Sequence, residues 1–136
     1  MKKLKLPVEE FTTPDPITAP EDASTDELRE LMAEHGIRHL PIVTAGQVVG
    51  IVSERDLKVV AGLELSEKQL VRASDIMAKD PVVVDSQATL DEVAYEMSSR
   101  KIGSVIVNEG SKFLGIFTST DALNALIEIT RSAREK

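Results

Sequence analysis

Gly50-Ile51-Val52-Ser53-Glu54-Arg55-Asp56 recurs further along the chain as Gly115-Ile116-Phe117-Thr118-Ser119-Thr120-Asp121. The second copy follows the first in a register that holds without a gap back to Asp15-Pro16, which recurs as Asp80-Pro81. Such an internal duplication predicts two structural repeats that bury their apolar surfaces together. Two related halves would also form two related clefts, and we expect a ligand to bind there.

The composition bounds the size and class of the protein. Its 136 residues suffice for one domain of ordinary size, whereas each half alone would have a marginal core, so we expect the halves to fold against each other. A formal net charge of −7 and only 3% aromatic residues argue against binding to a nucleic-acid backbone or stacking on single-stranded bases. The chain has no cysteine, and no run of residues has the length and apolarity of a membrane span. We therefore expect a cytoplasmic protein without disulfides, a signal peptide or membrane contact.

The first half of each repeat is predicted to be a short strand followed by a helix. Extended segments are expected at 16–19 and 81–84, the second of which contains three consecutive valines. Helices follow them, because Ser24-Thr25-Asp26-Glu27 and Thr89-Leu90-Asp91-Glu92 both fit the capping box. Gly36 suits the end of the first helix, since glycine tolerates the left-handed conformation that terminates many helices.

The second half of each repeat is predicted to be a β-hairpin followed by another helix. The predicted hairpin strands are 40–43 with 48–52 and 105–107 with 113–117, each pair joined by a short turn that contains glycine. The second helices begin near Ser53 and Thr118, and the last one runs to about Arg131. A polar connector, 63–74, joins the repeats and has room for a short extra helix. The order β-α-β-β-α, present twice, predicts an α+β fold.

This pattern resembles the cystathionine β-synthase (CBS) domain, which occurs in tandem pairs called Bateman modules. The residues that carry the resemblance are Ile76-Met77 with Asp80-Pro81 before the second repeat, Arg38-His39-Leu40-Pro41-Ile42-Val43 in the first, and both Gly-Ile-x-(Ser/Thr)-x-x-Asp segments. Phe11-Thr12 stands where Ile-Met would precede the first repeat, which is a departure from the family pattern.

The resemblance covers residues 8–131, nearly the whole chain, and implies the organisation of the domain. Two β-α-β-β-α repeats related by pseudo-twofold symmetry would form one compact module. The first repeat is expected at 8–62, the connector at 63–74 and the second repeat at 75–131.

Ser53-x-x-Asp56 and Thr118-x-x-Asp121 have two interpretations. The simpler is a pair of capping boxes, in which the hydroxyl caps the helix and the carboxylate lies in its first turn. The functional one uses the same geometry: an Asp at a helix start beside a cleft can accept both hydroxyls of a ribose, while helix amides and the Ser or Thr hydroxyl hold a phosphate. CBS pairs use this Asp for the ribose, so the resemblance favours a ligand-binding role for at least one copy.

The two repeats differ in charge around these motifs. The first has Arg38, His39 and Arg55 at positions where the second has Gly103, Ser104 and Thr120. In CBS pairs, basic residues at the Arg38-His39 position often reach toward the phosphates of the ligand; the alternative is a solvated strand end. The resemblance therefore implies that a polyanionic nucleotide is favoured where Arg38, His39 and Arg55 converge. Gly103 would leave space for a ring, or would simply be a glycine at a strand entry.

The family pattern also implies which residues line each cleft. The first cleft is expected to combine Arg38, His39, Leu40, Pro41, Ser53, Arg55 and Asp56 with the backbone of Val82, Val83 and Val84. The second is expected to combine Gly103, Ser104, Val105, Ile106, Thr118, Thr120 and Asp121 with Ile17, Thr18 and Ala19. Strand backbone would read the edge of adenine while aliphatic side chains cover its faces.

The sequence gives little indication of catalysis or of a metal site. His35 and His39 are four residues apart, but Gly36 is expected to break the helix between them. The acidic pairs Asp26-Glu27 and Asp91-Glu92 suit helix first turns better than acid–base chemistry. We therefore expect that the protein is not an enzyme and needs no obligatory cofactor.

Two functions remain after these exclusions. The first is a regulatory sensor that binds AMP, ADP, ATP or a related adenosyl compound in the clefts between the repeats and signals to a separate partner protein. These modules commonly form dimeric discs, so the resemblance also implies a homodimer, to which part of the apolar stripe of the last helix would contribute. The alternative is a dimerisation or scaffold module whose clefts are vestigial.

Overall fold

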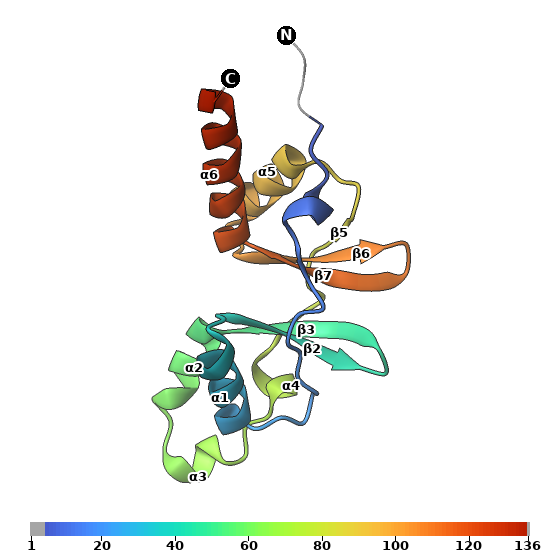
Figure 1. The fold of residues 1–136 in the computed structure, drawn as a ribbon. Helices are drawn as coiled ribbons and strands as arrows, with labels where there is room; N and C mark the ends of the chain where they lie inside the picture. Colours follow the sequence, from blue (N-terminus) through green and yellow to red (C-terminus); the bar gives the residue numbers. More distant parts are fainter. Residues whose placement is uncertain (1–4, 136) are drawn as a thin grey trace. The chain divides into compact units, whose positions relative to one another are not determined.

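The computed structural model describes residues 5–135, which form two compact units (Figure 1). The Asp56 unit consists of Pro16–Pro81. The Asp121 unit consists of the described residues up to Asp15 together with those from Val82 onward. Both units mix helices and strands, which confirms the α+β class.

In the Asp56 unit, two main helices pack on a small antiparallel sheet. Its elements are α1 (Thr25–His35), β2 (His39–Thr44), β3 (Gln47–Ser53), α2 (Glu54–Ala61), α3 (Leu65–Lys68), α4 (Ala73–Ile76) and β4 (Ala78–Lys79). The strands lie in the order β2-β3-β4, and Ala19 adds a parallel bridge to Ile42. The predicted helix, hairpin and second helix of the first repeat are therefore confirmed, as is the short helix in the connector.

The Asp121 unit repeats this arrangement with a longer sheet. Its elements are η1 (Val8–Phe11), β1 (Thr13–Pro14), β5 (Val83–Asp85), α5 (Leu90–Arg100), β6 (Ser104–Glu109), β7 (Lys112–Thr118) and α6 (Ser119–Glu135). The strands lie in the order β1-β7-β6-β5, with β5 parallel to β6 and the other neighbours antiparallel. The last helix was predicted to end at about Arg131, and it continues to Glu135.

The boundaries of the compact units differ from those of the sequence repeats. β1 precedes the first repeat's helix but pairs with β7, and β4 precedes the second repeat's helix but pairs with β3. The chain passes from one unit to the other at Asp15-Pro16 and returns at Pro81-Val82. Asp15 and Asp80, which occupy equivalent positions beside these crossings, both have positive φ, at 44° and 53°. Each unit is thus assembled from parts of both sequence repeats.

Two glycines allow these short strands to approach. A Cβ at Gly50 would lie 2.5 Å from Sδ of Met77 and 2.9 Å from the carbonyl oxygen of Ala78. A Cβ at Gly115 would collide with the backbone carbonyl of Thr13. The glycine in each repeated Gly-Ile motif is therefore required by the close approach of β4 or β1.

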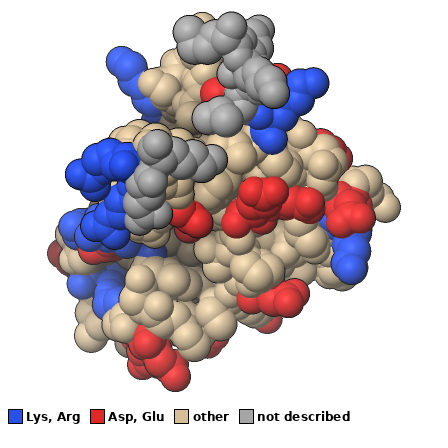
Figure 2. Space-filling model, turned by 45° about the horizontal axis from the view of Figure 1, so that its top comes forward, with Lys and Arg blue, Asp and Glu red and all other residues tan. Residues whose placement is uncertain are grey.

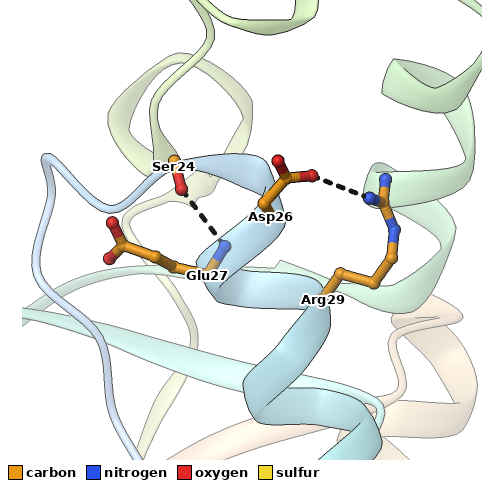
Figure 3. Close-up of polar contacts among 4 residues, drawn as sticks. All are labelled: Ser24, Asp26, Glu27 and Arg29. Atoms are coloured by element: carbon orange, nitrogen blue, oxygen red, sulfur yellow. Dashed lines mark hydrogen bonds and ion pairs between the residues drawn. The ribbon is translucent and has the colours of Figure 1, made fainter.

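Of the two predicted capping boxes, the one at Ser24 is present only in its serine half within residues 5–135, and the one at Thr89 is not formed. The hydroxyl of Ser24 accepts a hydrogen bond from the Glu27 amide at 3.1 Å, and the neighbouring Asp26 pairs with Arg29 (Figure 3). Gly36 ends α1 at φ 61°, as predicted. Thr89, in contrast, makes no side-chain cap, and among the described residues its buried hydroxyl has no hydrogen-bond partner.

The N-terminal segment explains the failure of the second cap. The amide of Leu90 donates to the Leu6 carbonyl at 2.7 Å, and the amide of Val8 donates to the Ala88 carbonyl at 2.8 Å. These backbone contacts hold the entry of α5 in place of the Thr89 hydroxyl. The prediction of a capping box at Thr89 was therefore wrong: backbone contacts with a segment distant in sequence fix the entry of the helix, and the Thr89 side chain makes no capping bond.

Each unit has its own hydrophobic core. In the Asp56 unit, the buried core residues are Ala19, Ala23, Leu28, Met32, Leu40, Ile42, Val52, Leu57 and Ala73. In the Asp121 unit they are Val8, Val93, Met97, Val105, Val107 and Phe117. Within residues 5–135, no helix combines the length and the apolarity needed to span a bilayer. On the face drawn in Figure 2, acidic side chains are spread widely, and a group of Lys and Arg side chains lies toward the left.

Candidate functional site

The turn from β3 into α2 forms the first candidate site. The Ser53 amide donates to Oδ2 of Asp56 at 2.8 Å, and the Asp56 amide donates to the Ser53 hydroxyl at 3.2 Å. The amide of Glu54 donates to the Arg38 carbonyl at 2.8 Å, which ties the start of β2 to the start of the helix. The simpler interpretation, a capping box, is confirmed. It fixes the half-buried carboxylate, and among residues 5–135 no hydrogen-bond donor is seen for its Oδ1.

The turn from β7 into α6 repeats this geometry. The Thr118 amide donates to Oδ2 of Asp121 at 2.9 Å, and the Asp121 amide donates to the Thr118 hydroxyl at 3.3 Å. The amide of Ser119 donates to the Gly103 carbonyl at 3.0 Å, which matches the contact between Glu54 and Arg38. The duplicated sequence therefore gives the same strand–helix turn twice, with a carboxylate pinned by the backbone in both.

Thr13 distinguishes the second turn from the first. Its hydroxyl lies 3.4 Å from Oδ1 of Asp121, the oxygen that does not face the Thr118 amide. The contact arises because β1 pairs with β7, where Thr13 lies opposite Ile116. In the other unit, Ala78 lies opposite Ile51 and has no hydroxyl to donate. Sequence reasoning missed Thr13, since the repeat register does not reveal that the strand before one helix joins the sheet of the other repeat.

His39 gives the first turn a titratable group. It is the first residue of β2 and lies opposite Ser53 in the strand register. Burial lowers the pKa of His39 below its ordinary value of 6.5; the Asp56 carboxylate raises it, and the Arg38 cation lowers it. Desolvation therefore favours the neutral form of His39 and outweighs the opposing effect of the Asp56 carboxylate. The corresponding residue of the second turn, Ser104, does not titrate.

The basic residues of the first repeat lie in different surroundings. Nε of Arg38 lies 3.5 Å from Oε2 of Glu54, and Nζ of Lys58 lies 3.6 Å from the other oxygen of the same carboxylate. Arg38 lines a groove of about 490 Å³ between α1 and α2. Arg55 is exposed in the first turn of α2. Convergence of Arg38, His39 and Arg55 on one ligand stays a prediction.

The extended segments of the predicted clefts run beside the hairpin of their own unit. The amide of Ala19 donates to the Pro41 carbonyl at 3.1 Å. In the Asp121 unit, the amide of Ile106 donates to the Val82 carbonyl at 2.9 Å, and Val83 lies opposite Ile106. Each unit therefore brings together its extended segment, its hairpin and its Asp-bearing turn. The predicted clefts draw residues from both units, and that grouping stays a prediction.

The side chains of the predicted site residues differ in their exposure to solvent, and therefore in whether they could contact a ligand. Leu40 and Val105 are fully buried in the cores of their units, so ligand contact there would come from backbone. Pro41 and Ile106 are also buried. The half-buried residues are Ile17, His39, Ser53, Asp56, Val82, Gly103, Ser104, Thr118 and Asp121, and the exposed ones are Thr18, Arg38, Arg55, Val83 and Thr120.

The geometry at the two histidines differs from that of a metal site. Gly36 follows His35 in the left-handed conformation, so the helix ends before His39. Among residues 5–135, no group of three or more His, Cys, Asp or Glu side chains is arranged to hold a metal ion.

Comparison with protein families identifies both halves of the chain. The model of the CBS domain matches residues 8–61 and again residues 73–128. The chain spans between 21% and 62% of the length of eight curated relatives that it matches, and the enzymes among them match over at most 32% of their own length.

Solved structures with the same fold cover nearly the whole chain. A Vibrio cholerae protein assigned provisionally to acetoin utilization (AcuB) is 31% identical, with a TM-score of 0.86 and 98% of each chain covered. CBSX2 of Arabidopsis thaliana, in complex with AMP, is 26% identical, with a TM-score of 0.80 over 92% of this chain and 98% of that one. The CBS domain pair of protein MJ0100, in complex with 5′-methylthioadenosine and S-adenosyl-L-methionine, is 29% identical, with a TM-score of 0.80 over 93% and 99%.

Proposed function

The chain belongs to the CBS domain family, and on that premise we propose that it is a regulatory module that binds an adenosine-containing ligand. AMP, ADP, ATP and S-adenosyl compounds are the candidate ligands. Support comes from two structures of the same fold, one of which holds AMP and the other 5′-methylthioadenosine and S-adenosyl-L-methionine. Ligand binding would favour one conformation of the module, and a partner protein would respond to that conformation.

The observation that carries the proposal is the strand–helix turn that ends in Asp56. One carboxylate oxygen is held by the Ser53 amide at 2.8 Å, which fixes the orientation of the group. The other oxygen is left for the hydroxyls of a ribose, and a hydrogen bond to a charged group contributes roughly 1.5–3 kcal/mol. Two such bonds with the burial of an adenine ring are sufficient for micromolar affinity, about −8 kcal/mol.

The Asp56 turn is the better candidate for a nucleotide with several phosphates. Arg38, His39 and Arg55 belong to its surroundings, whereas Gly103, Ser104 and Thr120 hold the equivalent positions at Asp121. Oδ1 of Asp121 already has the Thr13 hydroxyl at 3.4 Å, so a ribose hydroxyl would compete with it. We expect tighter binding at Asp56 for this reason, and a preference for less highly charged ligands at Asp121.

Thermal unfolding against a panel of ligands tests the proposal. The panel contains AMP, ADP, ATP, S-adenosylmethionine, NAD and GTP. A ligand that binds only the folded protein stabilises it by about 2.7 kcal/mol at one hundred times its dissociation constant. We expect one adenosyl ligand to raise the melting temperature by several degrees, and Asp56→Ala or Asp121→Ala to abolish that rise.

The matched control is Asp26→Ala, which removes an exposed first-turn carboxylate from α1. Each variant is compared with and without ligand, because loss of a capping group alone costs about 1 kcal/mol. The ligand-dependent rise should survive in Asp26→Ala. If nucleotide-free wild-type protein gains no stability from any member of the panel, the sensor proposal is wrong.

A scaffold function is the second candidate, and the capping boxes favour it. In both turns, the capping hydrogen bonds give the side chains a structural role that requires no ligand. These side chains are Ser53, Asp56, Thr118 and Asp121. In a scaffold, Asp56→Ala and Asp121→Ala would lower stability slightly and change nothing else. We propose a homodimer under either function, which sedimentation velocity of the wild-type protein tests directly.

A further inference from the structure

Arg38 and Glu54 form a charged pair beside the Asp56 turn. The amide of Glu54 donates to the Arg38 carbonyl at 2.8 Å, so the backbone holds the two residues next to each other. Nε of Arg38 lies 3.5 Å from Oε2 of Glu54. Within residues 5–135, no carboxylate other than that of Glu54 pairs with the Arg38 guanidinium. The cation that was expected to meet a ligand phosphate therefore already has an anionic partner.

The turn of the second repeat has the same backbone contact without the charges. There the Ser119 amide donates to the Gly103 carbonyl at 3.0 Å, and the Ser119 hydroxyl lies 3.4 Å from the same oxygen. Ser119 and Gly103 hold the positions of Glu54 and Arg38 in the repeat register. Since the second turn forms with uncharged residues at both positions, the ion pair is not needed to build the turn.

The ion pair places the Arg38 side chain on the groove between α1 and α2. Arg38, Glu54 and Lys58 all line this groove, which has a volume of about 490 Å³. Nζ of Lys58 lies 3.6 Å from Oε1 of Glu54, so that two cations share one carboxylate. Asp56, two residues further along α2, does not line the groove. The structure thus shows Arg38 held by Glu54 at a groove to which the candidate ribose ligand Asp56 does not contribute.

A phosphate would compete with Glu54 for Arg38. The side chains of Arg38 and Glu54 are 81% and 46% exposed, and an ion pair so open to water is easily separated. A phosphate is the stronger partner, because the guanidinium fork can bind two of its oxygens at once. A phosphate near the first turn of α2 would, however, be repelled by the Glu54 carboxylate. Glu54 therefore opposes phosphate binding in two ways, through Arg38 and through its own charge.

We propose that Glu54 is a specificity-determining residue of the Asp56 site, which holds Arg38 and so weakens the binding of phosphorylated ligands relative to uncharged adenosyl ligands. The inference rests on the proposed function, because it concerns the ligand of the same site. Adenosine and 5′-methylthioadenosine have no phosphate for Arg38 to bind, so their affinity is independent of the ion pair. The preference of the Asp56 turn for phosphates is then smaller than its basic residues alone would give.

Calorimetric titration of Glu54→Gln with ATP and with 5′-methylthioadenosine tests the effect of the carboxylate. Glutamine keeps the size of the side chain and removes its charge. All titrations use the Asp121→Ala background, in which the Asp56 turn is the remaining candidate site. The variant is expected to bind ATP about three- to tenfold more tightly, through release of an exposed ion pair and loss of one repulsive charge. Its affinity for 5′-methylthioadenosine should not change.

A double-mutant cycle shows whether Glu54 acts through Arg38. Arg38→Gln should weaken ATP binding, and Glu54→Gln added to it should then change the affinity by less than about twofold, because no guanidinium is left to release. An equal gain with and without Arg38 would mean that the carboxylate acts only by repulsion, which overturns the inference. The matched control is Asp26→Asn, which frees Arg29 on the same groove from its partner at 3.1 Å and should leave ATP affinity unchanged.

Tripolyphosphate separates this inference from the proposed function, because it needs no adenosine site. If no adenosyl ligand binds the wild type, the proposed function is wrong, but Glu54→Gln should still bind tripolyphosphate more tightly, and Arg38→Gln should cancel that gain. Weaker binding of ATP or tripolyphosphate by Glu54→Gln would mean that Glu54 positions Arg38 for the phosphate, and it would overturn the inference. An equal gain for 5′-methylthioadenosine and ATP would overturn it as well, since the effect would then not concern phosphate.

Discussion

His39 is expected to make the stability of the protein depend on pH. Burial lowers the pKa of His39 below 6.5 in the folded chain, so the unfolded chain binds more protons between the two values. The free energy of unfolding should therefore fall as the pH falls from 6.5 toward the folded pKa. His39→Gln removes this contribution. Urea unfolding at about pH 7.5 and about pH 5.5 should show a smaller difference for the variant than for the wild type.

The chain offers its own control for this experiment. His35 is the only other histidine and is exposed at the end of α1, so His35→Gln should leave the pH dependence of the wild type in place. The same loss of pH dependence in both variants would contradict the role of His39. A bound polyanion near His39 would favour its protonated form, and a ligand that binds there should therefore stabilise the protein more as the pH falls.

The contacts in the candidate site were predictable where the two residues involved are close together in the sequence. Ser53 and Asp56 are three residues apart, a spacing that favours the exchange of hydrogen bonds found in the structure. Thr13 is 108 residues from Asp121 in sequence, and its contact depends on a strand pairing of only two residues. Arg38 was expected beside a ligand, but whether its guanidinium reaches there depends on the competing carboxylate of Glu54. Long-range pairing and competition between side chains leave no pattern in a single sequence.

At the scale of the elements, Gly115 is expected to be the residue that tolerates substitution least in its hairpin. A Cβ there would collide with backbone of β1, which cannot rotate away as a flexible side chain can. Gly115→Ala should therefore lower the free energy of unfolding by about 2 kcal/mol, the usual scale for overpacking. Gly50→Ala should cost less, because its nearest neighbour is the flexible Met77 side chain at 2.5 Å. Urea unfolding of both variants measures the difference.

Gly62 provides the control for these substitutions. It follows α2 at φ −80°, and an added Cβ would meet only the Val59 carbonyl oxygen, at 3.5 Å. Gly62→Ala should leave stability unchanged or raise it by up to about 1 kcal/mol, since alanine restricts the unfolded chain. A loss as large as that of Gly115→Ala would mean that replacing glycine by alanine is costly in this chain without any close backbone contact, and that the approach of β1 does not explain the effect.

The predictions of secondary structure were confirmed where the sequence pattern extends over a whole helix or hairpin. The helix from Thr25 to His35 has a cap at one end and a glycine at the other, and both are local features. The short elements η1, β1, α4 and β4 were not predicted, because two to four residues carry too little periodicity. The positions of β1 and β4 follow from pairing with the distant strands β7 and β3. The contact between the Leu90 amide and the Leu6 carbonyl, at the start of α5, is likewise a long-range pairing that the local pattern around Thr89 does not reveal.

At the scale of the whole molecule, the two sequence repeats and the two compact units divide the chain at different places. The duplication relates residues that share a register, such as Val8 and Ala73. The units relate residues that share a core, and Val8 belongs to the core of the Asp121 unit while Ala73 belongs to that of the Asp56 unit. The start of the first repeat therefore packs in the core of the Asp121 unit, and the residue at the equivalent register position, just before the second repeat, packs in the core of the Asp56 unit. Neither repeat contains all the residues of a complete core, so we expect neither repeat to fold alone.

Val8→Ala is expected to destabilise the Asp121 unit, although Val8 belongs to the first sequence repeat. The side chain is fully buried among Val93, Val105 and Phe117, so its truncation leaves a cavity and should cost about 2 kcal/mol. Hydrogen exchange measures where the loss falls, because protection reports local stability. Amides of β6 and β7 should exchange faster in the variant, with little change in β2 and β3. Ala73→Gly, the equivalent change at a fully buried site, should show the reverse distribution. Loss of protection in β2 and β3 by Val8→Ala would mean that the core follows the sequence repeats after all.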